Sequence, residues 1–204
     1  MIESGSSTMI ESGSSAAVAA PIRDQLPGTT WQVPRCGKGI GHVITTPNSP
    51  DLIHGVTVTP YALWSDDRGY FLEAMRAGCG SIADFPMEST QVSATLTYAG
   101  AIKAFHYHRH QTDCWIPSMG TLQVALVDLR PESPSYGRRN TMYVGVMRPW
   151  RINIPPGVGH GYKALGTDPS MLIYVTSRFY DAADEGRIAY DDARVNYDWT
   201  VQHK

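Results

Sequence analysis

Short runs of β-forming residues follow one another from Leu52 almost to the end of the chain, and they constrain the fold more than any other feature of the sequence. Gly, Pro, Asp or Ser separates these runs at intervals of about ten residues. No segment keeps the period of 3.6 residues that marks an amphipathic helix. The pattern predicts an all-β sandwich or barrel over residues 52–204. The runs are GVTVTPYALW, RGYFLEA, QVSATLTYA, AIKAFHYH, CWIPSM, TLQVALVDLR, MYVGVM, RINIP, GYKAL and SMLIYVTSRFY.

The first 51 residues have a different texture. The sequence MIESGSS occurs at positions 1–7 and again at 9–15, and a Ser/Gly-rich repeat without an apolar face cannot offset the entropy of ordering it. We therefore expect residues 1–20 to be disordered. Residues 21–51 are rich in glycine and proline, which predicts a loop or an extended arm. Helical turns are expected only at Ala77–Ala83 and Ala182–Gly186.

Charge and cysteine content narrow the class of partner. The net charge is −2, from 17 basic and 19 acidic residues, and without a basic cluster the chain fits neither nucleic acid nor a polybasic membrane anchor. Its 3 cysteines are scattered, which matches neither a disulfide framework nor a zinc ribbon. No apolar run approaches the roughly 18 residues that span a bilayer. These features predict a cytoplasmic protein with reduced thiols, no membrane contact and a small-molecule partner.

Three histidines fall within five residues of the stretch GAIKAFHYHRHQTDCWIPSMG, at His106, His108 and His110. Residues two apart on a strand share a face, so we expect all three imidazoles on one side. The polar HRHQTD sequence predicts a hairpin between this strand and the next. Crowded titratable rings indicate a site that faces a cavity, although a solvated surface strand would also tolerate them.

The spacing in this stretch resembles the first cupin motif, and PPGVGH at 155–160 resembles part of the second. A longer set of segments, in the same order, is similar to the dTDP-4-dehydrorhamnose 3,5-epimerase family between Gly55 and Trp199. The segments are DDRGYFLE at 66–73, QVS at 91–93, AFHY at 104–107, VDLRPESPSYG at 127–137, IPPGVGHGY at 154–162, LIY at 172–174, and Glu185-Gly186 through Asp192 to Trp199.

This resemblance implies a cupin jelly roll that forms a homodimer and epimerises a nucleotide-linked 4-keto-6-deoxyhexose, with dTDP as the expected nucleotide. The family reaction removes a proton beside the ketone and returns one on the opposite face, and histidine has a suitable pKa for that task. The resemblance assigns the base to His106 and a cavity position to His160. Tyr174 and Tyr180 complete the predicted catalytic set.

The same resemblance places Arg68, Glu73 and Gln91 at positions that contact the nucleotide. Lys103 stands where the family has an arginine beside the diphosphate, which keeps the charge but loses the bidentate fork. Together these four residues are expected to form the mouth of the substrate site. His108 is added to the predicted substrate contacts.

Three departures from the family pattern bear on the chemistry. The family orients its base with an aspartate on a later C-terminal segment, for which no counterpart follows Trp199. Asp113 aligns with the lysine that stabilises the enolate, and a carboxylate would oppose that charge. Phe179 aligns with the general-acid tyrosine, although Tyr180 is adjacent. These departures lead us to expect epimerisation at fewer than both centres.

Three alternatives stay open from the sequence. A 3,4-ketoisomerase also carries a His-x-His motif, but lacks the DRGYFLE and VDLR segments. A metal-dependent cupin would bind one divalent ion through His106, His108, Asp113 and His160, and a ligated His106 would then no longer serve as the base. A catalytically silent sugar-nucleotide-binding protein is the third. The resemblance itself implies an enzyme without a cofactor.

Overall fold

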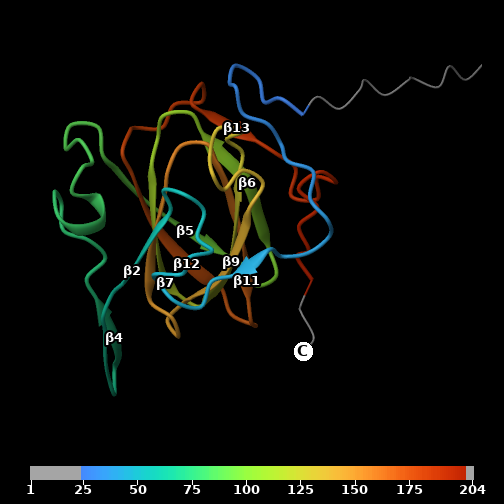
Figure 1. The fold of residues 1–204 in the computed structure, drawn as a ribbon. Helices are drawn as coiled ribbons and strands as arrows, with labels where there is room; N and C mark the ends of the chain where they lie inside the picture. The colour runs from blue at the N-terminus through green and yellow to red at the C-terminus, as the bar shows by residue number, and fades with distance from the viewer. Residues whose placement is uncertain (1–23, 201–204) are drawn as a thin grey trace, which may run out of the picture.

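The computed structural model describes residues 24–200, and two β-sheets face each other to form a barrel (Figure 1). The six-stranded sheet contains, in spatial order, β1 (His42–Val43), β9 (Arg139–Gly145), β8 (Thr121–Asp128), β11 (Val158–Leu165), β6 (Ile102–His108) and β13 (Glu185–Arg187). The five-stranded sheet contains β2 (Thr57–Pro60), β10 (Trp150–Ile154), β7 (Asp113–Met119), β12 (Ser170–Thr176) and β5 (Gln91–Thr97). The predicted all-β fold is confirmed. The predicted disorder of residues 1–20 lies outside the described residues.

The strands alternate between an inner and an outer core, as the two-residue period of a strand requires. In β8, Leu122, Val124 and Leu126 pack into the core between the sheets. Ala125 and Val127 of the same strand face a second core on the outside of the six-stranded sheet. Because both faces are covered, β8 is buried along nearly its whole length.

Segments before and after the barrel strands cover its outer faces. Val33 from the first segment and Trp199 from the last are buried in the outer core of the six-stranded sheet. Ile44 reaches the core between the sheets, and β1 pairs in parallel with β9. Residues 24–51 are mostly loop, and they pack against both cores of the barrel.

The outer face of the five-stranded sheet is covered by residues 73–90, which precede β5. That segment contains a single turn of 3-10 helix, η1 (Gly80–Ile82), inside the stretch where a helical turn was expected. Ile82 and Phe85 pack there against Ile116 of β7. At the second expected position, residues 182–184 form a turn that leads into β13, and the backbone nitrogens of Asp184 and Glu185 donate to the carbonyl of Asp181. Within residues 24–200, no helix is long and apolar enough to cross a membrane.

A two-stranded hairpin, β3 (Leu63–Asp66) and β4 (Gly69–Leu72), extends away from the barrel (Figure 1). Trp64 and Phe71 lie across from each other in its register, with ring centroids 5.6 Å apart. Both rings are more than half exposed. The hairpin therefore presents aromatic surface that the described chain does not cover.

The turn after His108 corrects one expectation from the sequence. β6 and β7 were expected to pair as a hairpin across the HRHQTD turn, but β6 belongs to the six-stranded sheet and β7 to the five-stranded sheet. The turn carries the chain from one sheet to the other. As a result, His108 and Asp113 approach each other across the space between the sheets.

Candidate active site

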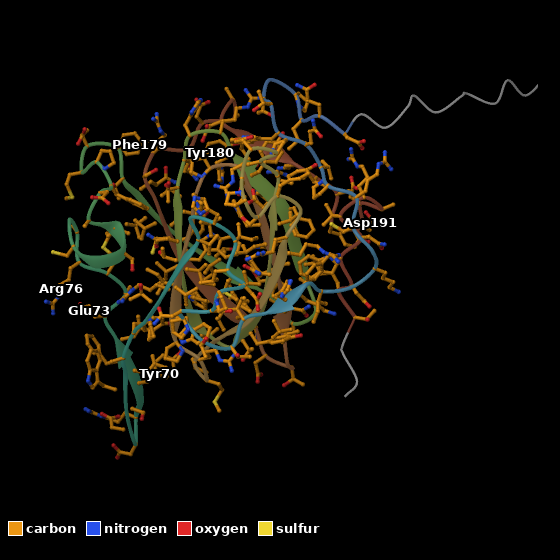
Figure 2. The ribbon with its side chains drawn as sticks, in the orientation of Figure 1. Tyr70, Glu73, Arg76, Phe179, Tyr180 and Asp191 are labelled. Carbon is orange, nitrogen blue, oxygen red and sulfur yellow. The ribbon has the colours of Figure 1, made fainter. Side chains whose placement is uncertain are left out.

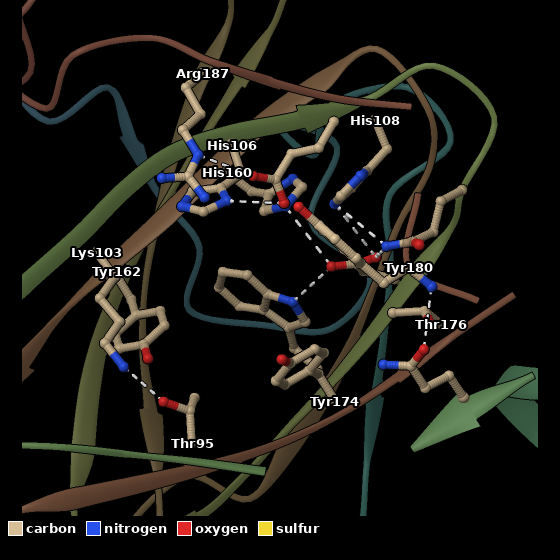
Figure 3. Close-up of a pocket in the computed structure, with 15 residues that line it drawn as sticks. Thr95, Lys103, His106, His108, His160, Tyr162, Tyr174, Thr176, Tyr180 and Arg187 are labelled. Atoms are coloured by element: carbon tan, nitrogen blue, oxygen red, sulfur yellow. Dashed lines mark hydrogen bonds and ion pairs between the residues drawn. The ribbon is translucent and has the colours of Figure 1, made fainter. Parts of the chain in front are cut away.

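A cavity of about 370 Å³ opens between the two sheets, and inward-facing residues from both sheets line it (Figure 3). The two-residue alternation of β6 explains how histidines reach it. Phe105 and Tyr107 are buried in the outer core, so His106 and His108 point the other way, into the cavity. The remaining lining residues are Gln91, Thr95, Lys103, Gln111, Asp113, Trp115, His160, Tyr162, Tyr174, Thr176, Tyr180, Glu185 and Arg187.

His106 is paired with a carboxylate from β13. Its Nδ1 lies 3.5 Å from Oε2 of Glu185, whose Oε1 is 2.8 Å from Nε of Arg187. Burial lowers the pKa of His106 below its ordinary value; Glu185 opposes this shift and Arg187 adds to it. Burial raises the pKa of Glu185, but Arg187 and His106 outweigh it, so the net shift is downward. A half-buried imidazole held by an ionised carboxylate is well suited to accept a proton.

Glu185 lies beside His106, where the sequence had shown no carboxylate. The orienting carboxylate was expected on a later C-terminal segment, whereas here it comes from β13, whose residues pair directly with β6. Gly186 lets β13 lie so close, because an added Cβ would overlap the ring of Tyr107. The alternation in Glu185-Gly186-Arg187 was the only local signal for β13, and it was too short to identify a strand.

His160, on β11, is enclosed by aromatic rings. Its ring centroid lies 5.3 Å from that of His108 and 5.2 Å from that of Trp115. Nδ1 of His160 is 3.0 Å from the carbonyl oxygen of Val158, so Nδ1 carries a hydrogen and donates it to this carbonyl. Burial lowers the pKa of His160 to about 4, despite the nearby Asp113 carboxylate. The imidazole is therefore neutral at pH 7.

Asp113 is buried beside these histidines. Its oxygens accept hydrogen bonds from the amide of Gln111 at 2.7 Å and from the indole of Trp115 at 3.1 Å. Nε2 of His108 lies 3.8 Å from one oxygen, and Nε2 of His160 lies 3.7 Å from the other. Gln111 and Trp115 were not predicted as site residues, because a lone amide and a lone indole carry no motif.

Two cationic side chains line the same cavity. Lys103 donates a hydrogen bond from Nζ to Oγ1 of Thr95 at 2.5 Å, and Arg187 is mostly exposed beyond its pairing with Glu185. Figure 3 shows Arg187 on the side of His106 and His160, with Lys103 below them. Lys103 was predicted to contact the substrate, and the structure brings it into the cavity. Arg187 was not predicted. Both charges are available for an anionic group at the opening.

The predicted tyrosines occupy different parts of the cavity. Tyr174 of β12 lies on the opposite sheet from His106, next to Trp115 in the strand register. Tyr180 lies at the rim, where its backbone nitrogen donates to Oε1 of Gln91 at 3.0 Å. Phe179 is more than half exposed and is not among the lining residues (Figure 2). The phenol adjacent to the family position is thus at the opening, and Tyr174 is the deeper one.

Three other predicted positions fall outside this cavity. Arg68 pairs with Asp66 on the extended hairpin, and Glu73 pairs with Arg76 just after it (Figure 2 labels Glu73 and Arg76). Within a single chain, Arg68 and Glu73 therefore do not line the cavity that Gln91 and Lys103 line, because the hairpin extends away from the barrel. His110 is exposed and lines a second hollow, since β6 ends at His108 and the two-residue alternation ends with it.

Comparisons with known proteins agree with this architecture. The family model described as dTDP-4-dehydrorhamnose 3,5-epimerase matches residues 51–204. The spore coat polysaccharide biosynthesis protein SpsL of Bacillus subtilis is 39% identical over 75% of this chain and 100% of its own length. A probable low-salt glycan biosynthesis epimerase of Haloferax volcanii is 33% identical, over 74% of this chain and 96% of that protein.

A solved structure gives the same result. NovW, a 4-keto-6-deoxy sugar epimerase from the novobiocin biosynthetic gene cluster of Streptomyces spheroides, superposes with a TM-score of 0.64 at 25% identity. The match covers 73% of this chain and 76% of NovW. The barrel, the histidine-lined cavity and the family match over three quarters of the sequence lead to one conclusion. The chain is an isomerase with a cupin jelly roll and belongs to the dTDP-4-dehydrorhamnose 3,5-epimerase family.

Proposed function

We propose that this protein epimerises a nucleotide-linked 4-keto-6-deoxyhexose, with dTDP as the nucleotide, at one carbon next to the ketone. The observation that carries the proposal is the pairing of His106 with Glu185 on one wall of the cavity, opposite Tyr174 on the other wall. Inversion of a carbon requires proton removal from one face and proton delivery to the other. A cavity with a base on one sheet and a phenol on the facing sheet meets that requirement.

In this mechanism His106 removes the proton beside the ketone. Because the pKa of His106 is below its ordinary value, the imidazole is unprotonated and ready to act at neutral pH. Glu185 stabilises the imidazolium that forms. Tyr174 then delivers a proton to the opposite face of the same carbon. Lys103 and Arg187 supply positive charge for the diphosphate.

The direct test is deuterium uptake from D₂O into dTDP-4-keto-6-deoxyglucose, followed by NMR at the two carbons that flank the ketone. We expect label at one carbon and inversion of that centre. Label and inversion at both carbons would show a double epimerase. Binding of dTDP without any label would identify a silent binding protein and refute the proposal.

Removal of the deeper phenol should separate the two predicted tyrosines. Tyr174→Phe is expected to lower the rate of epimerisation by roughly 10²-fold or more, because general-acid catalysis contributes about 10²–10⁴-fold. Proton removal itself should continue, so wash-in of deuterium without inversion is the expected signature. Tyr180→Phe, at the rim, is the matched control and should change KM more than kcat. The opposite ranking would assign the acid to Tyr180.

We also propose that the protein works as a homodimer. The aromatic face of the β3–β4 hairpin and the outward residues of β5, Val92 and Leu96, are all about half or more exposed in the described chain. A second copy would remove this apolar surface from water. Light scattering coupled to gel filtration should give a mass of twice 22.4 kDa. A mass of 22.4 kDa at micromolar concentration would contradict this.

A further inference from the structure

Three buried ligand atoms converge at the end of the cavity nearest the turn between β6 and β7. His108, Asp113 and His160 are 8%, 4% and 4% exposed, and each offers an atom that lies within 4.8 Å of the other two. An ion with bonds of about 2.0–2.2 Å holds its ligand atoms no more than about 4.4 Å apart. The distances of 3.7 and 3.8 Å from Asp113 to the two imidazoles already satisfy that limit.

The ring of His160 is oriented by one hydrogen bond. Because its Nδ1 donates to the carbonyl of Val158, its Nε2 is the ring atom that faces Asp113, at 3.7 Å from a carboxylate oxygen. An imidazole nitrogen and a carboxylate oxygen are common ligands of divalent first-row metal ions. A cation between them would bind both atoms.

His108 presents its Nε2 to the same space. The amide nitrogen of Gln111 lies 3.3 Å from that atom and 2.7 Å from Asp113. An amide nitrogen can only donate, so Nε2 of His108 is an acceptor as well. The amide nitrogen of Gln111 thus lies where acceptor atoms of His108 and Asp113 converge. A bound cation would displace this amide.

We propose that His108, Asp113 and His160 bind one divalent first-row transition metal ion. Two imidazoles and one carboxylate, with further positions open to the cavity, suit iron, manganese, cobalt, nickel or zinc. His106 is not part of this set, because its Nδ1 faces Glu185. From the sequence, His106 could be either a metal ligand or the base, but not both. In the structure the three proposed ligands do not include His106, so a bound metal ion and a His106 base are compatible.

The surroundings of the ligands resemble the outer shell of a metal site. Ligating histidines commonly donate their second nitrogen to a backbone carbonyl or a carboxylate. His160 does so to Val158, and Nδ1 of His108 faces Oδ2 of Asp184 at 3.9 Å. Asp184 is itself held by backbone nitrogens of His110 and Gln111. Trp115 fixes the carboxylate of Asp113 from the side.

The proposed ion would also stabilise the negative charge that forms during epimerisation. This role, unlike metal binding itself, rests on the proposed function. Proton removal beside a ketone creates negative charge on oxygen, and Asp113 replaces the lysine that would stabilise it. When bound, a divalent ion would supply Lewis acidity at that place. Metal binding by the three side chains does not depend on the identity of the substrate.

The test uses untagged full-length protein, treated with EDTA, dialysed, and titrated with Co²⁺ while visible absorption is recorded. We expect saturable binding of about one Co²⁺ per chain, with d–d bands in the visible region. Saturating Co²⁺ should also raise Tm by roughly 5–10 °C, because a ligand that binds only the folded state stabilises it. Absence of saturable binding of Co²⁺, with the same result for Zn²⁺ and Fe²⁺ by calorimetry, would overturn the proposal.

Matched variants identify the ligands. His108→Ala and Asp113→Asn should each weaken Co²⁺ binding by at least the roughly 10–100-fold that loss of an outer-shell partner costs. His110→Ala removes an exposed histidine two residues away and should bind Co²⁺ as the wild type does. His106→Gln should keep full Co²⁺ affinity. Unchanged binding in both ligand variants, or lost binding in His106→Gln, would overturn the three-residue site. Tm in EDTA checks that each variant is folded.

Chelation separates the metal proposal from the proposed function. Deuterium exchange that stops in EDTA-treated protein and returns with Co²⁺ supports both. Exchange that persists after complete metal removal would overturn the Lewis-acid role and leave the epimerase intact. Stoichiometric Co²⁺ binding without exchange on any 4-keto-6-deoxy dTDP-sugar would leave the metal site intact and refute the epimerase.

Discussion

Replacement of His106 by glutamine is expected to lower kcat for deuterium exchange by roughly 10²- to 10⁴-fold, which is the usual contribution of a general base. Glutamine keeps polar atoms beside Glu185 but cannot accept and release a proton at neutral pH. KM should change much less than kcat, because the substrate contacts from Lys103 and Arg187 stay in place. Proton exchange at the substrate carbon, measured by NMR in D₂O, reports the step directly.

Two further variants serve as comparisons for His106→Gln. Glu185→Gln leaves the base in place but removes the charge that orients it, so a smaller loss in kcat is expected, with KM nearly unchanged. His110→Ala changes the histidine that points away from the cavity and should retain wild-type exchange. If His106→Gln exchanged deuterium at the wild-type rate, the base would have to be another residue and the proposed mechanism would fail.

Loss of the Asp128 carboxylate is expected to have the largest effect on stability. Asp128 ends β8 and is fully buried. Arg130 donates to both of its oxygens from Nε and Nη2 at 2.8 and 3.0 Å, and the hydroxyls of Ser133 and Ser135 each donate at 2.6 Å. Asp128→Ala removes these four hydrogen bonds and leaves the mostly buried Arg130 without its carboxylate partner. The free energy of unfolding should fall by about 3–5 kcal/mol, as when one partner of a buried ion pair is removed.

The same network sets a pH dependence with a definite sign. Burial raises the pKa of Asp128, but the bonds from Arg130, Ser133 and Ser135 outweigh it and hold the pKa below its ordinary 3.8. A carboxyl with a depressed folded-state pKa stabilises the fold above its unfolded pKa, and this contribution is lost as the pH falls through the folded value. The difference in stability between wild type and Asp128→Ala should thus be full at pH 7 and shrink below about pH 4.

Thermal unfolding measures both effects. For a chain of this size, the loss at pH 7 corresponds to roughly 6–20 °C in Tm. Asp66→Ala is the matched control, because it removes a carboxylate whose partner Arg68 is 85% exposed, and such surface pairs contribute little to stability. A Tm for Asp128→Ala within about 2 °C of the wild type would show that the turn after β8 does not depend on this carboxylate.

The sequence by itself determined where most strands lie along the chain. Each strand from β5 to β12 overlaps a predicted run, although β9 and β11 begin three residues before theirs. The overlap arises because alternating side chains and Gly, Pro or Asp breaks are properties of adjacent residues. The spacing of His106, His108 and Asp113, with His160 from a second motif, likewise identified residues that line one cavity. β1 and β13 were missed, since strands of two or three residues carry too little pattern to detect.

Only the tertiary structure decided how these pieces meet. The sequence placed β6 and β7 in one hairpin, whereas the fold puts them in facing sheets, and this brings Asp113 to His108 and His160. The fold also pairs His106 with Glu185, and it places Arg68 on a separate hairpin. Backbone pairing between distant strands depends on which apolar faces can be buried together, and no local period records that choice.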